Sequence, residues 1–507
     1  MMTPRILASI LIGGVLTGCV HVAEMPPVAL PEAAAYRGTQ SLQPVASTAL
    51  QPDNWWTLYE DPVLDRLQQQ LLDNSPDLGS ALARYQQARA ATDALRAARL
   101  PTVGASAEGL RIRQSENRPL RGAASPDYYS SGTLGLSLDY ELDLWGRIGR
   151  QVAAGVAEEQ AAQADLAGAR LALQAQLADT LLTLRGADQE IELLRETEAA
   201  FARATGIVGE RRRAGLASGL DVARAEAQQE SARSQLHQVQ ARRDVLEHAI
   251  AALVGAHAST FSVAPASAAD VLPVVPAGLP SELLQRRPDI AAAQRRVAAA
   301  NASVGVARTA FFPSLRLSAT GGYLSSDLGN LIAAPNLFWA VGPGLLATLF
   351  DGGRRRAEVA RAEAVLDETG QTYRATVLAA FRQVEDQLSL LHRYGEAAQA
   401  EQRTVAAAQR ALDMASSRYR DGAASYLDVV TAQTTHLQAR RNALDLSTRQ
   451  RRATVQLVRA LGGGWSQDEA WVSRGAQVSM LSIQVQQGTS PRAHPMASQG
   501  RGTHGPD

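Results

Sequence analysis

The sequence contains one cysteine and no lysine among its 507 residues. A single cysteine excludes an internal disulfide framework, a multi-cysteine zinc site and an iron–sulfur cluster. All fifty basic residues are arginine, and fifty acidic residues balance them. The chain therefore has no net charge that would draw it to nucleic acid, and no nucleic-acid partner is expected.

Aromatic residues are scarce and long apolar runs are missing. Aromatics make up 5% of the chain, whereas 46% of residues are hydrophobic and 20% are charged. This alanine-rich mixture excludes disorder along the whole length and favours long helices over a β-sandwich. Beyond residue 19, no window reaches the roughly 18 consecutive apolar residues of a transmembrane helix. A mature chain that crosses a membrane would have to do so with β-strands.

Motifs for catalysis are also absent. None of the eight histidines pairs with another at i, i+4, and the sequence has no HExxH, phosphate-binding P-loop or GxSxG motif. The clusters Arg211–Arg213 and Arg354–Arg356 fall at predicted helix ends, where we expect them to favour the helix dipole or to lie on exposed surface. We expect no enzyme activity, no cofactor and no metal.

The one cysteine, Cys19, follows a short basic segment and the apolar stretch from Ile6 to Leu16. Together with Leu16-Thr17-Gly18, this start resembles a bacterial lipoprotein signal peptide, residues 1–18. The resemblance implies cleavage before Cys19 and acylation of its thiol and new amino group, with several acyl chains giving a lasting anchor. Val20 is not Asp, which by the same resemblance permits delivery to the outer membrane. The alternative is an ordinary secretory signal with a chance cysteine.

The rest of the chain repeats itself. Ser75-Pro76-Asp77-Leu78 matches Arg287-Pro288-Asp289-Ile290 further along the chain. In a second pair of matching segments, the spacing between the two copies is about five residues shorter. We divide the chain into an acylated equatorial segment (19–61), a first repeat (62–255), a linker (256–280), a second repeat (281–464) and a C-terminal segment (465–507) that is largely disordered after 485.

Each repeat reads as helix, strand pair, long helix and helix. The predicted helices are 77–99, 147–213 and 220–254 in the first repeat, and 289–310, 354–420 and 427–461 in the second. A helix of 67 residues is roughly 100 Å long and needs partners of equal length. The two shorter helices of a repeat, laid end to end, sum to roughly 87 Å and could cover it. A coiled-coil rod is the alternative.

The predicted strands are 102–113, 133–144, 314–324 and 338–350. From Leu134 to Leu144 the even positions are apolar, while the odd positions are small or charged. This length matches a tilted membrane-spanning strand, although a soluble half-buried strand would alternate in the same way. Pro343 is awkward in a paired central strand. Four strands cannot close a barrel, so we expect oligomerisation, and three copies would supply twelve strands.

Several motifs in order resemble the outer-membrane factor family, the TolC-like, NodT-type lipoprotein channels of tripartite efflux pumps. They are Trp55-Trp56, Tyr140 to Arg147, Phe350 to Arg355, Arg287 to Ile290, Tyr419 to Gln433 and Leu461 to Trp465. The resemblance implies a homotrimer with a twelve-stranded β-barrel among outer-membrane lipids, continued by a periplasmic α-helical barrel. The implied partners are a periplasmic adaptor and an inner-membrane, proton-driven RND transporter. Such a protein passively conducts drugs and toxic compounds to the exterior.

The same resemblance places the turns 215–219 and 422–425 at a periplasmic tip where the channel closes. Asp428 and Asp221 are candidates for acidic rings, which would repel one another and select cations. A second acid often follows three residues later in the family, but this chain has Thr431. The other gate candidates are Tyr419, Arg420, Tyr426 and Leu427, with turn glycines Gly215, Gly219 and Gly422 and strand–helix junctions Gly146, Gly352 and Gly353. A solvated turn or helix N-cap is the alternative for each.

Two other functions remain open on the sequence alone. A duct of this kind could serve an ATP-driven type I protein secretion system, although the lipid anchor favours the drug-type pump. The chain could instead be a lipid-anchored periplasmic scaffold without a pore. The scaffold leaves the strand alternation and the clustered aromatics unexplained.

Overall fold

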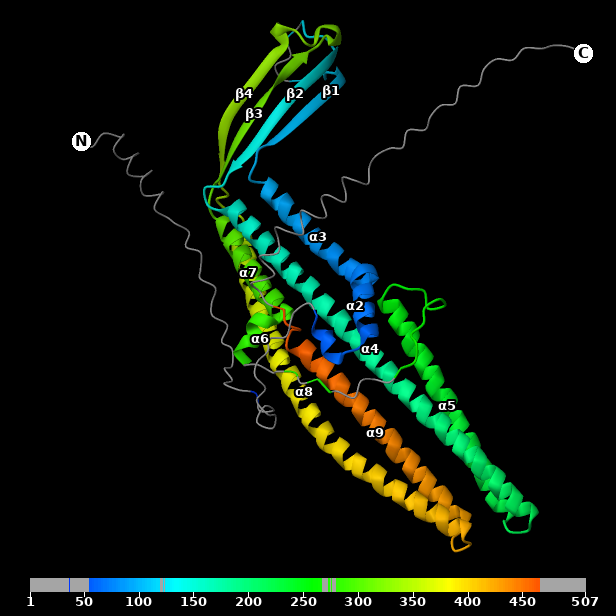
Figure 1. Ribbon diagram of the computed structural model, residues 1–507. Helices are drawn as coiled ribbons and strands as arrows, with labels where there is room; N and C mark the ends of the chain where they lie inside the picture. The colour runs from blue at the N-terminus through cyan, green and yellow to red at the C-terminus, as the bar shows by residue number, and fades with distance from the viewer. Residues whose placement is uncertain are drawn as a thin grey trace, which may run out of the picture.

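The computed structural model describes residues 36, 54–118, 122, 124–266, 272–273, 275 and 280–465. The molecule is elongated, with a β-sheet at one end and two helical hairpin turns at the other (Figure 1). Cys19 and the segment after 465 lie outside the described residues. None of the described helices is both long enough and apolar enough to cross a membrane.

Two copies of one structural unit follow each other along the chain. The first comprises η2 (Trp55–Tyr59), α2 (Pro62–Asn74), α3 (Pro76–Ala97), β1 (Thr102–Arg113), β2 (Tyr128–Leu142), α4 (Arg147–Arg213) and α5 (Gly219–Leu253). The second comprises α6 (Pro280–Arg286), α7 (Pro288–Thr309), β3 (Ser314–Ser325), η3 (Leu328–Asn330), η4 (Ala334–Asn336), β4 (Leu337–Leu346), α8 (Arg354–Arg420) and α9 (Tyr426–Ala460). Corresponding helices have equal lengths: 22 residues in α3 and α7, 67 in α4 and α8, and 35 in α5 and α9.

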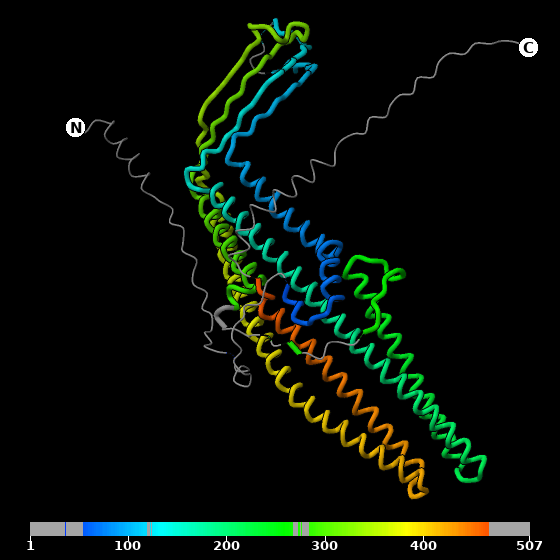
Figure 2. Tube along the Cα trace, viewed as in Figure 1, coloured from blue at the N-terminus to red at the C-terminus, as the bar shows by residue number. Residues whose placement is uncertain are grey.

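The helices stand side by side as a wall (Figure 2). Helix α4 packs against α3 and α5 on one side and against α7 and α9 on the other, and α8 packs against α7 and α9. The shorter helices therefore cover the long ones end to end, as their summed lengths predict. Helix α8 forms one edge of the wall. Its described residues bury only Val377, Ala380, Val384, Leu388 and Ala408.

A carboxylate caps the N-terminus of each long helix. Asp143 accepts hydrogen bonds from the backbone N–H groups of Ile148 (3.0 Å) and Gly149 (2.7 Å). Asp351 accepts from the Arg355 N–H (3.2 Å) and its Nε (2.6 Å). These acids satisfy free N–H groups and complement the helix dipole.

The junction glycines precede these helices with left-handed backbone: φ is 72° at Gly146, 66° at Gly352 and 92° at Gly353. Of the two alternatives predicted for Arg354–Arg356, the helix dipole is wrong, whereas exposed surface is confirmed for Arg354 and Arg356. These arginines occupy the first turn of α8, where the dipole disfavours cations, and the Asp351 carboxylate offsets them.

The four strands form one antiparallel sheet in the order β1-β2-β3-β4. The predicted bounds of two strands are wrong. The strand predicted at 133–144 is β2, which begins at Tyr128 because Arg113 of β1 pairs with that residue, and ends before Asp143 turns to cap α4. The strand predicted at 338–350 ends at Leu346. Within one chain, Pro343 lies in an edge strand, because β4 is paired with β3 alone.

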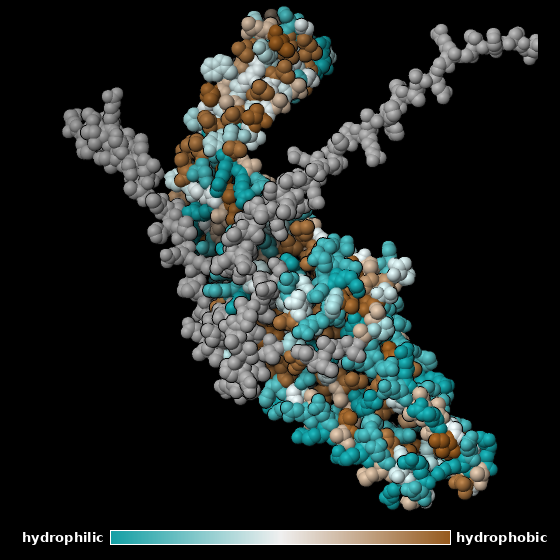
Figure 3. All heavy atoms as spheres, viewed as in Figure 1, coloured by the Kyte–Doolittle hydropathy of each residue, from teal (hydrophilic) through white to brown (hydrophobic). Residues whose placement is uncertain are grey.

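Side chains divide the sheet into two faces. The register aligns Val103, Leu138, Ala319 and Val341 across the four strands on one face. On the other face, Ser137, Asp139, Ser318 and Thr320 make the half nearer the helices polar, whereas Leu110, Ile112 and Phe338 lie on this face toward the far end. The apolar face is open: Trp339, for example, is 74% exposed. Figure 3 shows hydrophobic residues gathered over the sheet, whereas the far ends of the helices are mostly hydrophilic.

The largest hydrophobic core lies midway along the wall, where η2 and α2 pack beside α4. Buried charges fix the segment that follows α5 to the same place. Arg185 of α4 is 1% exposed and donates to the Ala264 carbonyl (2.8 Å), and Arg243 of α5 pairs with Asp188 (2.7 Å). Removing one of these partners would leave a buried charge uncompensated.

Candidate functional site

Two short turns end the helical hairpins at the pole farthest from the sheet (Figure 1). The α4–α5 turn contains Gly215 and the α8–α9 turn contains Gly422, and both have φ of 76°. A left-handed residue just past a helix end favours glycine because a Cβ would be strained there. The chain therefore reverses in the same way in both repeats.

Each turn leads into a capping box. The Ser218 Oγ accepts from the Asp221 N–H (3.1 Å) and donates to the Asp221 carboxylate (2.7 Å). In the second turn, the Ser425 N–H and Oγ both donate to the Asp428 carboxylate, each at 2.9 Å. The two candidate acids thus help to cap the N-termini of α5 and α9. Asp428 remains exposed, whereas Asp221 is half-buried and lies 3.8 Å from Arg224.

Arg211 joins the two hairpins at this pole. Its guanidinium, from the end of α4, donates to the Tyr419 carbonyl (Nη1, 3.1 Å) and to the Arg420 carbonyl (Nη2, 3.1 Å). It also lies over the Tyr419 ring, 4.7 Å from the centroid. The α8 helix ends at Arg420, so Arg211 satisfies free carbonyls and places a cation at the negative end of the α8 dipole.

A small apolar cluster packs beneath this bridge. The Tyr419 and Tyr426 rings are 5.3 Å apart, and Tyr426 is buried with Val208, Ala225 and Val429. Burial raises the pKa of the Tyr426 phenol, and the neighbouring Tyr419 and Asp221 add to the effect. The phenol is therefore neutral at physiological pH.

The remaining candidates differ in what they contact. Arg420 is exposed, and its Nε is 3.4 Å from the Ser416 carbonyl. Leu427 is exposed, and the Thr431 hydroxyl donates to the Leu427 carbonyl (2.9 Å). Gly219 is the first residue of α5, where a side chain would collide with the Arg212 guanidinium. None of these three contacts crosses between the hairpins.

Above the tip, ion pairs join α4 to α9. The Arg441 guanidinium donates to Glu190 (2.7 Å), which also pairs with Arg242 of α5. Arg452 binds Asp179 through two contacts of 3.0 Å. The α9 helix therefore supplies the cations and α4 the carboxylates along this seam.

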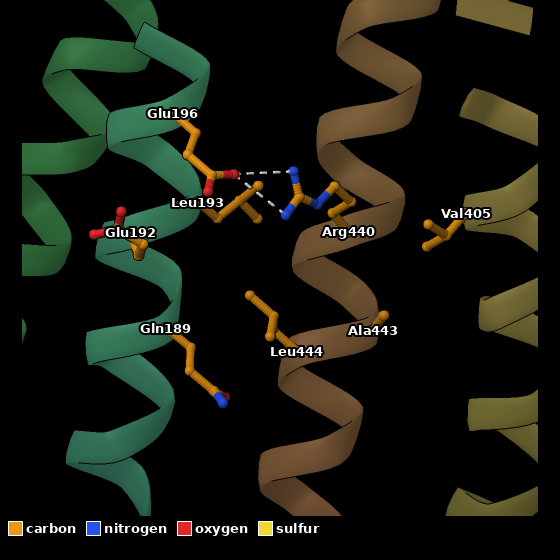
Figure 4. Close-up of a pocket in the computed structure, with 8 residues that line it drawn as sticks. All are labelled: Gln189, Glu192, Leu193, Glu196, Val405, Arg440, Ala443 and Leu444. Carbon is orange, nitrogen blue, oxygen red and sulfur yellow. Dashed lines mark hydrogen bonds and ion pairs between the residues drawn. The ribbon is translucent and has the colours of Figure 1, made fainter. Parts of the chain in front are cut away.

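A groove with a volume of about 380 Å³ lies along the same seam. Figure 4 shows Arg440 of α9 reaching Glu196 of α4 across it, with Leu193 and Leu444 between the same two helices. The Arg440 Nη1 is 3.4 Å from the Glu196 carboxylate, and both side chains are about half exposed. The seam is therefore open on this side and held by solvent-accessible pairs. Within the described residues, no group of three or more histidine, cysteine or acidic side chains is placed to hold a metal.

Comparison with known proteins identifies the fold and its class. The outer membrane efflux protein family matches residues 67–256 and 279–463, which is most of the chain. The chain belongs to this family.

Relatives of this efflux protein match it over nearly their whole length. Outer membrane protein OprJ of Pseudomonas aeruginosa is 32% identical over 469 residues, covering 92% of the chain and 97% of OprJ. The toluene efflux pump outer membrane protein TtgC of Pseudomonas putida is 32% identical, covering 94% and 99%. The crystal structure of the outer membrane protein VceC of Vibrio cholerae matches with a TM-score of 0.76 and 30% identity, covering 82% and 99%.

This efflux protein thus belongs to a family of outer-membrane transport proteins, and its fold matches that of VceC. Sequence reasoning did not assign Arg211 to the tip, because its partners are backbone carbonyls more than 200 residues away. The capping boxes were readable in advance, since Ser218 and Ser425 each stand three residues before an acid.

Proposed function

We propose that this efflux protein is the outer-membrane duct of a tripartite pump. Three copies would form a channel that passively conducts small molecules from an inner-membrane RND transporter, through a periplasmic adaptor, to the exterior. The observation that carries the proposal is a sheet with one open apolar face and two free edges, joined directly to a wall of helices with a free edge of its own.

The free sheet edges argue for the trimer. In hydrocarbon, each unpaired backbone group costs several kcal/mol, so β1 and β4 need partners. Pairing β4 of one copy with β1 of the next closes a twelve-stranded β-barrel from three copies, with the apolar face toward lipid and the polar face toward the lumen. The exposed edge of α8 would then meet α3 and α5 of the neighbouring copy, and the helices would form a periplasmic barrel.

The tip would be the gate of this duct. Three-fold symmetry brings three copies of each tip residue around one axis, so Asp428 and Asp221 would form rings of carboxylates. The exposed position of Asp428 suits a pore-lining ring, and Thr431 in place of a second acid would weaken the filter. The Arg211 bridge and the tyrosine pair would hold the hairpins together in the narrow state.

Small molecules are the proposed cargo. TtgC is named for toluene efflux, and the chain resembles it over 94% of its length. A lipid on Cys19 would add a second hold on the outer membrane.

Reconstitution into planar bilayers tests the proposal. We expect discrete single-channel currents that trivalent cations block from the side of the tip. A protein that inserts as a folded oligomer but carries no current would refute the duct. Deleting the gene and measuring susceptibility to toluene and to antibiotics would then test the cargo separately, because a pore without a susceptibility change would reject small-molecule efflux alone.

A further inference from the structure

Two arginines stand on the apolar face of the sheet, at its end farthest from the helices. Arg111 pairs in register with Ser130, and Arg113 with Tyr128. The Arg111 Nη1 donates to the Ser130 Oγ (3.0 Å), and the Arg113 guanidinium lies 5.6 Å from the Tyr128 ring centroid. Among the described residues, neither guanidinium has a carboxylate as an ion-pair partner.

The face below these arginines is apolar in successive cross-strand rows. From the helix end outward, the rows are Leu142–Leu315–Leu345, Tyr140–Leu317–Pro343, Val103–Leu138–Ala319–Val341, Ala105–Leu136–Gly321–Trp339 and Ala107–Leu134–Tyr323–Leu337. A row of Gly109, Gly132 and Ser325 follows, and the arginines come next. The face therefore changes from apolar to cationic within two rows along the strand direction.

The height of this change matches a membrane surface. Leu142 and Leu134 are eight residues apart, or about 27 Å along the strand, which becomes about 20 Å for strands tilted by about 40°. The apolar band of a membrane barrel is about 25 Å tall. On the same scale, the backbone of Arg111 lies about 10 Å above the last apolar row. Its long side chain can reach back to the headgroup level.

Strand alternation places Arg111 and Arg113 on the face that points away from the proposed lumen. Glu108, the only acid in β1, lies on the polar face together with Ser137 and Asp139. Arg111 and Arg113 alternate with these positions and point away from them. Pairing of the β1 edge with another strand would use backbone groups, so both guanidinium groups would remain available on the lipid side.

We propose that Arg111 and Arg113 bind the phosphate groups of anionic lipid headgroups in the outer leaflet. The inference rests on the proposed function, which places this face against lipid. A guanidinium matches phosphate with two parallel hydrogen bonds, and its planar fork is better suited to this than a point charge. The two arginines would fix the depth of the sheet in the membrane.

Binding of a phosphorylated lipid tests the proposal. The full-length protein, purified in a neutral detergent, is titrated with bis-phosphorylated lipid A and with the same lipid after enzymatic dephosphorylation, and bound lipid is counted by native mass spectrometry. We expect the double variant R111Q/R113Q to bind the phosphorylated lipid about tenfold more weakly, and the dephosphorylated lipid as the wild type does. The variant R111K/R113K should recover part of the affinity.

The control is R316Q, on the polar face near the helix end, where Arg316 lies 3.9 Å from Glu141. Its lipid binding should equal that of the wild type. Equal affinities of R111Q/R113Q and the wild type for the phosphorylated lipid would overturn the inference. It would also be overturned if inorganic phosphate displaced the bound lipid as effectively as added lipid A. Currents are measured on the same preparations: conducting channels without the arginine effect reject only this site, whereas a non-conducting wild type rejects the duct.

Discussion

At the scale of single residues, Arg211 hydrogen-bonds the end of one hairpin to the end of the other. Replacing it by Ala removes two charge-assisted hydrogen bonds to the α8 carbonyls and the contact with the Tyr419 ring. After discounting for partial exposure, we expect a loss of about 1 kcal/mol, which shifts a two-state tip about fivefold toward its open form. Single-channel recordings should show a higher mean conductance.

The matched control is Arg213→Ala, two residues away on the same helix. Arg213 is 79% exposed at its side chain and, among the described residues, forms an ion pair with Glu210 at 3.6 Å. Its loss should leave the conductance unchanged. If both variants conduct alike, Arg211 does not restrain the tip.

Asp428 combines two roles that substitutions can separate. Asp428→Asn keeps an oxygen that accepts from the Ser425 N–H and Oγ but removes the charge, so it should weaken block by trivalent cations and leave thermal stability nearly unchanged. Asp428→Ala removes the capping box as well and should also cost about 1 kcal/mol of stability. Unaltered block in both variants would reduce Asp428 to a helix cap.

Tyr426 gives the tip a dependence on alkaline pH. Its folded-state pKa is raised above the usual 10.0 by burial, so the neutral phenol is favoured in the folded tip. The stability that this provides is fully present below pH 10.0 and is lost as pH rises through the higher folded value. We expect the conductance to rise at alkaline pH as this stability is lost. Tyr426→Phe keeps the ring and cannot ionise, so it should abolish that rise. A rise of the same size in both proteins would assign it to another group.

At the scale of elements, Glu190 connects three helices, because it pairs with Arg441 of α9 and Arg242 of α5 from its place on α4. Its side chain is only 13% exposed. Glu190→Gln leaves two arginines without their partner, and we expect the melting temperature to fall by a few degrees. Glu192→Gln is the control on the same helix, since Glu192 is 66% exposed and its ion pair within the described part of the chain is a long one, 3.9 Å to Arg195. Equal melting temperatures for the two variants would show that the seam does not depend on this node.

The elements themselves were largely predictable, and their partners were not. Both 67-residue helices begin and end where the sequence predicts, because each lies between a glycine junction that follows a strand and a glycine turn. The start of β2 at Tyr128 was missed because Tyr128-Tyr129-Ser130-Ser131 does not alternate, and its strand conformation follows from pairing with β1. Local pattern determined the helices, whereas cross-strand pairing determined this boundary.

Contacts between distant segments set the limit for the site. The acids at the two tips could be found from the repeat, since Asp221 and Asp428 occupy matching positions. The bridge from Arg211 to α8 could not, because it depends on how two hairpins 200 residues apart lie against each other. The same holds for Arg185, whose partners come from several segments.

At the scale of the whole molecule, the wall of helices has a centre and two edges. Asp386 lies on the free edge of α8, because two residues correspond to about 200° of helix rotation from buried Val384. The chain has no lysine with which an amine-reactive crosslinker could react. A photo-crosslinking amino acid at Asp386 is therefore the suitable probe of neighbouring copies in the membrane.

Irradiation of intact membranes should yield crosslinked products of two and three chains and no larger species, because three copies close the ring and leave no free edge. Mass spectrometry should locate the acceptor peptides in α3 or α5, the opposite edge of the wall. The same probe at Glu192, on the central helix α4, has its own chain on both sides and should give no product between copies. Products of four or more chains would exclude the closed trimer, and acceptor peptides in α8 itself would require the copies to meet through identical edges, which a three-fold ring cannot provide.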